Sequence, residues 1–397
     1  MRSYLPVLLA LVVVPLASVA APSDLSPSDK GVEKPAAESA KAPFTGERPA
    51  VDVAILLDTS NSMDGLISQA KSQIWTIVQQ FADAKKNGKT PSLRVALFEY
   101  GNTGLPASEG YLRQVVPLSD DLDKLSEALF ALKTNGGDEY CGQVIDEALK
   151  RLDWTDLDGS YKAIFIAGNE PFTQGPVDFR LACGKAIGSG VVVNTIHCGP
   201  NATGVSGHWA EAAELAEGEA FNIDQDRRVV QIKCPQDGVL LKLNVELNGT
   251  YLWYGAKRQR GEYARNQTAQ DTNAASLGYS AAASRAMAKA GAAYSNVGRD
   301  LVDSYLADES SIKAVKTEEL PDALQKMTPD ERVEHVRQLA ARRAELKQQI
   351  GKLSAEREAY LVAERAKRAN TPGGETLGDA VTTAIGGQLK QAGFATE

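Results

Sequence analysis

The chain has 397 residues, of which 43% are hydrophobic and 24% charged, with a formal net charge of −8 and a pI of about 5.2. This length exceeds one ordinary hydrophobic core and predicts two structural units with tails. The acidic balance argues against a general nucleic-acid binder and against a protein of anionic membrane surfaces, because both need a basic face. The composition is that of a soluble globular protein.

The chain begins with one arginine, then an apolar run, then small residues, in the order MRSYLPVLLALVVVPLASVAAPSD. This order is typical of a cleavable secretory signal over residues 1–20, and the apolar run is too short for a comfortable membrane span. Residues 21–50 are rich in proline, alanine, serine and charge, which predicts a disordered leader. No later segment is apolar enough to cross a bilayer. We therefore expect an exported protein, periplasmic or secreted.

Strand-like and helix-like segments alternate from Val51 to about residue 228. Apolar, β-branched runs predict six strands, at 51–57, 93–101, 111–118, 161–168, 191–199 and 219–223. Helical spacing of apolar residues predicts helices between them, at 63–86, 120–133, 141–152, 177–190 and 208–218. Repeated βα units with nearly continuous apolar strands predict a doubly wound α/β fold around a mostly parallel sheet.

Residues 229–368 show a different pattern, which predicts a helical extension. After an amphipathic helix at 240–247, the chain from 257 to 307 is nearly free of strand formers. Between Thr328 and Arg368 a helix about 60 Å long is expected, with a heptad of large residues at Leu339, Leu346, Leu353 and Tyr360 that Arg343 and Arg357 interrupt. Such a helix suits an antiparallel pair with 257–307 or a dimerising coiled coil, and the interrupted seam favours the first. Residues 369–397 are expected to form a flexible tail.

The stretch VDVAILLDTSNSMDGL, residues 51–66, places three oxygen-bearing side chains at alternate positions after a buried strand: Asp58, Ser60 and Ser62. In an open α/β sheet, ligands bind beyond the carboxyl ends of the strands. Hard oxygen ligands suit Mg²⁺ or Ca²⁺, but one carboxylate and two hydroxyls are too few to fill roughly six coordination positions. The motif therefore predicts a metal site that a partner group completes.

Asp58-Thr59-Ser60-Asn61-Ser62 resembles the DxSxS motif of the metal-ion-dependent adhesion site in the von Willebrand factor type A family, and the order of elements from 51 to about 228 is similar to that family. The resemblance implies a non-enzymatic module that binds a protein partner. It also implies a divalent ion (Mg²⁺, or Ca²⁺ or Mn²⁺) that an acidic residue of the partner completes. The alternative is a scaffold protein, with a vestigial metal site, whose helical region makes the functional contacts or oligomerises.

The family site also uses a threonine in a second loop and an aspartate in a third. In TNGGDEYCG, Asp138 stands where the threonine is expected, and Thr134 lies four residues earlier. In FIAGNEPF, Gly168 occupies the aspartate position, with Asn169 and Glu170 beside it. The resemblance thus implies a ligand set of Asp58, Ser60, Ser62 and Asp138, with Thr134 and Glu170 as further candidates.

Simpler interpretations compete with these site assignments. Asp58 and the two serines are also suited to capping the following helix, and Asp138 to capping the helix at 141. Glu170 before a proline is also consistent with a solvated loop acid. His197, and His208 with Glu211 one turn on, invite a zinc site, but a packed or solvated histidine is the commoner case.

Four cysteines, at 141, 183, 198 and 234, complete the inventory of reactive groups. An even number in an exported chain favours two disulfides, whose connectivity the sequence leaves open. A third and weaker functional hypothesis is a hydrolase that uses Asp138, Glu170 or Cys141, the last paired with His197.

Overall fold

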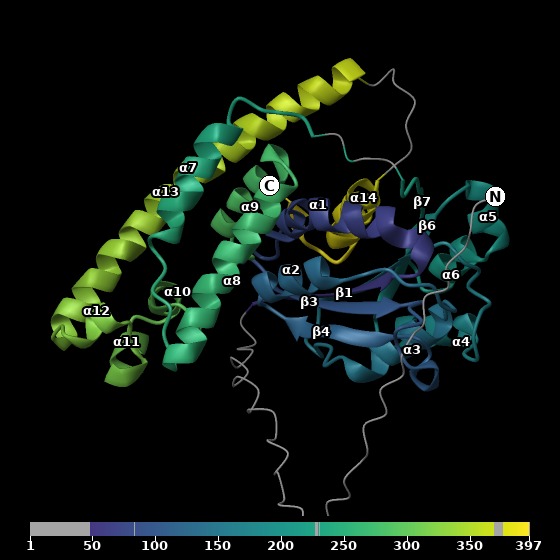
Figure 1. Ribbon diagram of the computed structural model, residues 1–397, viewed down its shortest axis with the longest axis horizontal. Coiled ribbons are helices and arrows are strands. Elements are labelled where there is room, and N and C mark those ends of the chain that lie inside the picture. The colour runs from purple at the N-terminus through teal and green to yellow at the C-terminus, as the bar shows by residue number, and fades with distance from the viewer. Residues whose placement is uncertain (1–47, 83, 227–228, 230, 369–375, 397) are drawn as a thin grey trace, which may run out of the picture. The chain divides into compact units, whose positions relative to one another are not determined.

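The computed structural model describes residues 48–82, 84–226, 229, 231–368 and 376–396 (Figure 1). The described residues form one compact unit. The predicted signal sequence, 1–20, and the predicted leader up to residue 47 lie outside the described residues. None of the helices described combines the length and the apolar character that a membrane span requires.

A six-stranded sheet has the strand order β4-β3-β1-β5-β6-β7. Neighbouring strands are parallel except for β4, which runs antiparallel to β3. The prediction of a doubly wound, mostly parallel sheet is therefore confirmed. The strands span Ala50–Asp58 (β1), Ser92–Tyr100 (β3), Arg113–Ser119 (β4), Tyr161–Gly168 (β5), Val192–Cys198 (β6) and Ala220–Ile223 (β7).

Helices cover both faces of this sheet, as Figure 1 shows. One face packs against α1 (Asp64–Ala82), α2 (Leu122–Ala131) and α14 (Leu377–Gln391), and the other against α3 (Cys141–Arg151), α4 (Phe179–Gly188) and α6 (Trp209–Leu215). The short α5 (Asn201–Ser206) precedes α6. Alternate side chains of β1 enter the two cores, so the strand is apolar on both faces from Val53 to Leu57.

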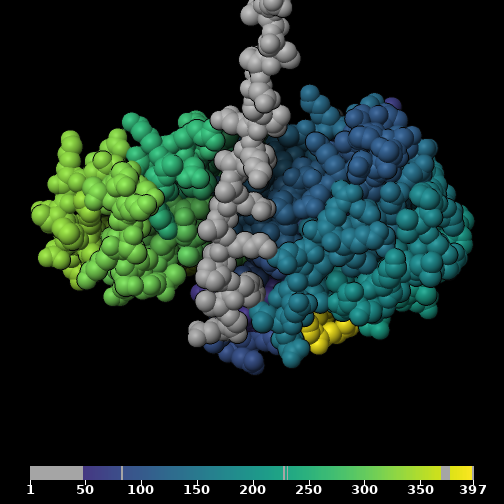
Figure 2. Space-filling model, turned by 90° about the horizontal axis from the view of Figure 1, so that it is seen from below, coloured from purple at the N-terminus to yellow at the C-terminus, as the bar shows by residue number. Residues whose placement is uncertain are grey.

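The end of the chain belongs to this fold. The expectation of a flexible tail over 369–397 is wrong for Thr376–Thr396, while 369–375 and 397 lie outside the described residues. Apolar residues at helical spacing bury one face of α14: Leu377, Val381, Ala384, Ile385 and Leu389. After α14, β8 (Ala395–Thr396) pairs with β2 (Ala84–Lys85). Figure 2 shows this part of the chain as a yellow patch bordered by the blue and teal of the first half.

A buried amide fixes α14 to the sheet. The Gln388 side chain donates from Nε2 to Asn194 Oδ1 at 2.6 Å, and its Oε1 accepts from the Tyr161 hydroxyl at 2.7 Å. Asn194 and Tyr161 belong to β6 and β5. Because buried polar groups need partners, these bonds define one position of α14 along the sheet.

The helical extension consists of α7 (Asp237–Asn248), α8 (Lys257–Ser276), α9 (Tyr279–Ala290), α10 (Leu301–Ala307), α11 (Ser311–Ala314), α12 (Asp322–Gln325) and α13 (Pro329–Arg368). The long α13 contacts α7, α9 and α10 of the same chain. These contacts are within the chain, and they include α7 as well as the α9 and α10 helices of the 257–307 segment.

The two arginines that interrupt the heptad are buried. Arg343 is 0% exposed and lies 2.6 Å from both Asp300 and Asp303. Arg357 lies 2.9 Å from Asp237. Buried charges persist only when they are paired, so these arginines match acids of α7 and of the region around α10. Arg343 and Arg357 would weaken an apolar coiled-coil seam, but here their ion pairs fix the position of α13 along its neighbours in the same chain.

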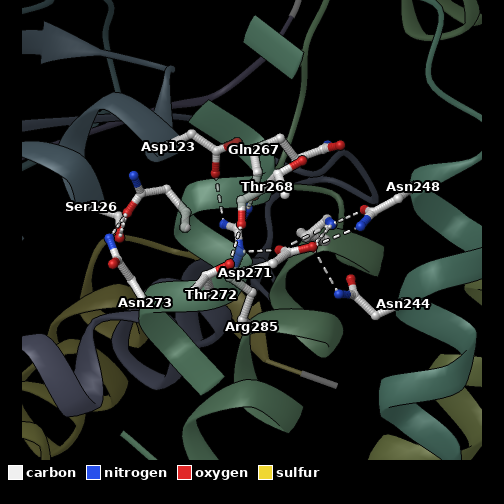
Figure 3. A network of polar contacts seen from close by, with 12 residues as sticks. Asp123, Ser126, Asn244, Asn248, Gln267, Thr268, Asp271, Thr272, Asn273 and Arg285 are labelled. Carbon is white, nitrogen blue, oxygen red and sulfur yellow. Dashed lines mark hydrogen bonds and ion pairs between the residues drawn. The ribbon is translucent and has the colours of Figure 1, made fainter. Parts of the chain in front are cut away.

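A second buried ion network joins the extension to the sheet-containing half (Figure 3). Arg285 of α9 donates to Asp271 of α8 at 2.6 Å and to Asp123 of α2 at 2.7 Å. The Lys289 ammonium, also buried, pairs with Asp271 at 3.2 Å. Buried ion pairs therefore connect α8 and α9 of the extension to α2 of the first half of the chain.

The four cysteines are buried and unpaired, so the expected disulfides are not found. Their distribution separates Cys198 and Cys234 from the other two. Cys141 and Cys183 lie in the core on one face of the sheet, Cys198 lies in the core on the other face, and Cys234 lies in a separate cluster beside Leu361. An even count of cysteines carries no information about such placement.

Candidate functional site

Three loops meet at the carboxyl ends of the parallel strands. The first loop follows β1 and runs into a short 3-10 helix, Asn61–Met63, the second precedes α3, and the third follows β5. The Asn135 amide of the second loop donates to the Thr59 carbonyl of the first at 2.9 Å. This bond brings together the first two sequence-predicted loops, at the edge where open α/β sheets bind ligands.

In the first loop, Asp58 ends β1 and is 0% exposed. Its Oδ1 accepts from the Ser60 amide at 2.7 Å, while the Ser60 and Ser62 hydroxyl oxygens lie 3.2 Å apart. Ser60 is the N-cap of the 3-10 helix, but its side chain makes no capping bond. The two hydroxyls and the carboxylate are thus gathered at one place, and helix capping does not account for them.

In the second loop, the structure places Glu139, rather than Asp138, against Asp58. Asp138 is exposed and accepts from the Tyr140 hydroxyl at 3.2 Å. Glu139 is 5% exposed. A methyl group on Gly101 would lie 2.6 Å from Glu139 Cγ and 2.8 Å from Asp58 Oδ1, so both side chains converge on this glycine. Sequence reasoning missed Glu139, because two adjacent acids in a glycine-rich loop carry no signal of which one is buried.

The other predicted ligands have partners of their own. The Thr134 hydroxyl donates to Asp64, the first residue of α1. Glu170 is half-buried, and its carboxylate accepts from Gln174 Nε2 at 3.0 Å. Asn169, beside it, accepts a long contact of 3.5 Å from the Ser62 hydroxyl. The third loop thus reaches the first through Asn169.

Gly168, at the position of the family's third-loop aspartate, is enclosed. Its virtual Cβ would overlap the Tyr100 hydroxyl and would lie 3.1 Å from Asp58 Oδ2. The Tyr100 hydroxyl donates to the Ala167 carbonyl at 3.0 Å, which holds the ring in this place. The space that an aspartate side chain would need is therefore filled by Tyr100.

Asp58 and Glu139 form an uncompensated pair of buried acids. Burial raises the pKa of Asp58 to about 7, and the charge of Glu170 adds to this. Burial, followed by the charge of Asp58, raises the pKa of Glu139 to about 8. Asp58 Oδ2 and Glu139 Oε2 are buried without a hydrogen-bond partner. A buried carboxylate oxygen without a partner is costly, and a cation removes that cost.

These residues fit a divalent ion of the hard, oxygen-binding type, since the donors are carboxylates and hydroxyls. Among the residues that the structure describes, no three His, Cys, Asp or Glu side chains come together as a metal-binding group. The donor set at this edge therefore depends on the serine hydroxyls as well as on the two carboxylates.

The histidine and cysteine alternatives find no support in the contacts. His197 Nδ1 lies 2.8 Å from Asn222 Oδ1, and His208 Nδ1 lies 2.7 Å from Glu211 Oε2 on the surface. The Cys141 thiol contacts the Tyr100 hydroxyl at 3.8 Å, and burial raises its pKa well above the usual value. A thiol nucleophile needs the opposite shift.

The model of the von Willebrand factor type A domain matches residues 52–223. Residues 52–223 are a von Willebrand factor type A (VWA) domain. The match ends at the last strand of the sheet, so the helical extension and α14 lie outside it. VWA domains generally mediate protein–protein interactions, some of them through a metal-ion-dependent adhesion site.

Solved structures similar to the chain include the SpRpn10 VWA domain, with 15% identity, a TM-score of 0.35, and coverage of 45% of this chain and 90% of that one. BatB from Bacteroides thetaiotaomicron, described as a conserved hypothetical protein, has 18% identity, a TM-score of 0.34, and coverage of 44% and 91%. Proximal thread matrix protein 1 from the mussel byssus, with a zinc-occupied MIDAS motif, has 15% identity, a TM-score of 0.35, and coverage of 45% and 43%. No curated protein matches the chain.

Proposed function

We propose that the VWA domain binds a protein partner at the carboxyl edge of its sheet, and that binding depends on a divalent ion held by Asp58, Ser60 and Ser62. The observation that supports this most directly is the Asp58 carboxylate, which is 0% exposed and has an oxygen without a partner. Such a group costs free energy unless a cation compensates it. The proposed role is non-enzymatic binding by an exported protein.

Each residue of the first loop has a separate task in this proposal. The Ser60 amide bonds to Asp58 Oδ1, which leaves Oδ2 for the ion. The Ser60 and Ser62 hydroxyls supply neutral oxygens, and the Ser62 hydroxyl lies 3.5 Å from Asn169 Oδ1 of the third loop. When bound, the ion supplies a coordination position that a partner oxygen can complete. Mg²⁺ is the first choice, with Ca²⁺ and Mn²⁺ as alternatives.

Calorimetric titration of the full chain with Mg²⁺, Ca²⁺ and Mn²⁺ tests the ion. We expect saturable binding that Asp58→Ala abolishes and that Glu214→Gln, at an exposed acid of α6, leaves unchanged. Absence of binding at millimolar metal would rule out the metal-dependent function. Partner capture that persists in Asp58→Ala would favour the scaffold alternative.

A further inference from the structure

We propose that Glu139 is a direct ligand of the ion, and that the acids left over at this edge make it a docking site for a basic segment of a protein partner. This inference rests on the proposed function, since it concerns the same ion. It replaces the expectation that an acidic residue of the partner completes the site. Geometry, charge and the aromatic rim of the site support it independently.

The geometry concerns the two buried carboxylates. Asp58 ends the first strand of the domain and Glu139 immediately precedes the Tyr140–Cys141 start of α3, yet both side chains close on Gly101, whose φ of 76° excludes most other residues. At 0% and 5% exposed, each retains one oxygen without a partner. Two buried carboxylates that converge on one glycine, each with an oxygen that has no partner, can supply two ligands to one cation.

The charge at this edge exceeds what a divalent ion can balance. Asp58 and Glu139 together compensate the ion, and Glu170 and Asp138 remain beside them. The acids Asp58, Glu170 and Asp138 all lie close enough for their charges to act on Glu139. The occupied site therefore keeps a negative field, which repels a carboxylate of a partner and attracts an ammonium or guanidinium group.

Two basic side chains near these loops already have partners. Arg113 pairs with Glu99, which also accepts from the Thr59 hydroxyl at 3.1 Å. Lys71 donates to the Leu132 carbonyl at 3.4 Å and faces the charge of Asp64. Neither group offsets the excess acid at the site.

An aromatic pair borders the acids. Tyr140 follows Glu139 directly, and its ring meets Tyr111 edge-to-face with centroids 5.9 Å apart. Both tyrosines are half-buried, and Tyr111 holds a φ of 53°, which is uncommon for a residue with a side chain. Tyrosine faces beside carboxylates bind lysine and arginine side chains through cation–π attraction together with ion pairing. Tyr111 and Tyr140 are therefore suited, together with the neighbouring acids, to bind lysine or arginine side chains of a partner.

The ligand role of Glu139 is tested by titrating the full chain and its variants with MnCl₂. Glu139→Gln keeps the shape and removes the charge, so we expect affinity to fall at least about tenfold, as it does in Asp58→Asn, while Glu214→Gln behaves as the unmodified chain. If Asp58→Asn lost affinity for Mn²⁺ while Glu139→Gln kept full affinity, this inference would be overturned and the proposed function would stand. Absence of binding to the unmodified chain would overturn both.

The docking preference is tested by selecting displayed random peptides on the immobilised full chain in MgCl₂. We expect enrichment of lysine and arginine, and we expect that Asp138→Asn with Glu170→Gln, or Tyr140→Ala, reduces capture of the enriched peptides at least about tenfold, unlike Glu214→Gln. Enrichment of aspartate and glutamate, or of no class, would overturn the basic-partner assignment.

Discussion

Arg285 of the helical extension and Asp123 of the VWA domain lie 2.7 Å apart, in an ion pair where the arginine side chain is only 1% exposed (Figure 3). The same guanidinium reaches Asp271 and packs over the Trp75 ring of α1 at 4.3 Å. One side chain of α9 therefore contacts α1, α2 and α8. Through this ion pair, the helical extension stabilises the VWA domain.

Arg285→Met should strongly destabilise the protein, because it leaves Asp123 and Asp271 buried with less compensation. We expect a loss of about 3–5 kcal/mol in the free energy of unfolding, measured by urea titration. Arg258→Met is the matched control, since its pair with Glu262 is exposed and should be worth less than about 1 kcal/mol. Equal effects of the two substitutions would show that the network does not hold the two halves together.

Lys289 should make stability depend on alkaline pH. Burial lowers its pKa from 10.5 to about 8, although Asp271 opposes the shift. A lysine whose pKa is lowered by folding stabilises the protein above its unfolded pKa and loses that contribution as the pH falls through its folded pKa. The unmodified chain should therefore gain stability relative to Lys289→Met as the pH rises from 8 to 10.5. Parallel pH profiles of the two unfolding free energies would contradict this.

Gln388→Ala should destabilise the sheet although it lies beyond the matched domain. The substitution leaves the Asn194 side chain and the Tyr161 hydroxyl buried without their partner, at a cost of about 1–3 kcal/mol. Gln391→Ala, at an exposed position of the same helix, is the control and should change the unfolding free energy by less than about 0.5 kcal/mol. Thermal or urea unfolding followed by circular dichroism provides the comparison.

Restoring the family's third-loop acid with Gly168→Asp should harm the protein, because the Tyr100 hydroxyl fills the required space. We expect a loss of about 1–3 kcal/mol from overpacking. The loss should be smaller when the same change is made in a Tyr100→Phe chain, and a double-mutant cycle measures this coupling. Additive effects would show that the hydroxyl is not the obstacle.

The sequence predicts the sheet and the first loop well, because both depend on local patterns. Continuous apolar runs identify strands buried on both faces, and the spacing of Asp58, Ser60 and Ser62 is visible within five residues. Glu139 depends instead on contacts with Gly101 and Asp58, which are distant in the chain. No periodicity distinguishes it from Asp138.

The predictions of a flexible tail and of two disulfides failed for a similar reason, since both features depend on tertiary contacts. The segment of α14 is rich in glycine, alanine and threonine, so its apolar face is narrow, and only packing on α1 and the sheet makes it a stable helix. An even number of cysteines and an oxidising compartment allow disulfides to form. A disulfide also requires two cysteine side chains that lie close together in the fold. Here the sheet separates Cys198 from Cys141 and Cys183.

The docking of α14 has a consequence for the order in which the protein can fold. The Gln73 side chain of α1 bonds Thr376, a partner 303 residues later. During synthesis, the face of the sheet that α14 covers stays open until α14, which follows α1 at this long separation, has left the ribosome. Contacts of such long range form slowly and leave apolar surface exposed in the meantime. A nascent chain of this protein therefore has a long period in which it depends on protection from aggregation.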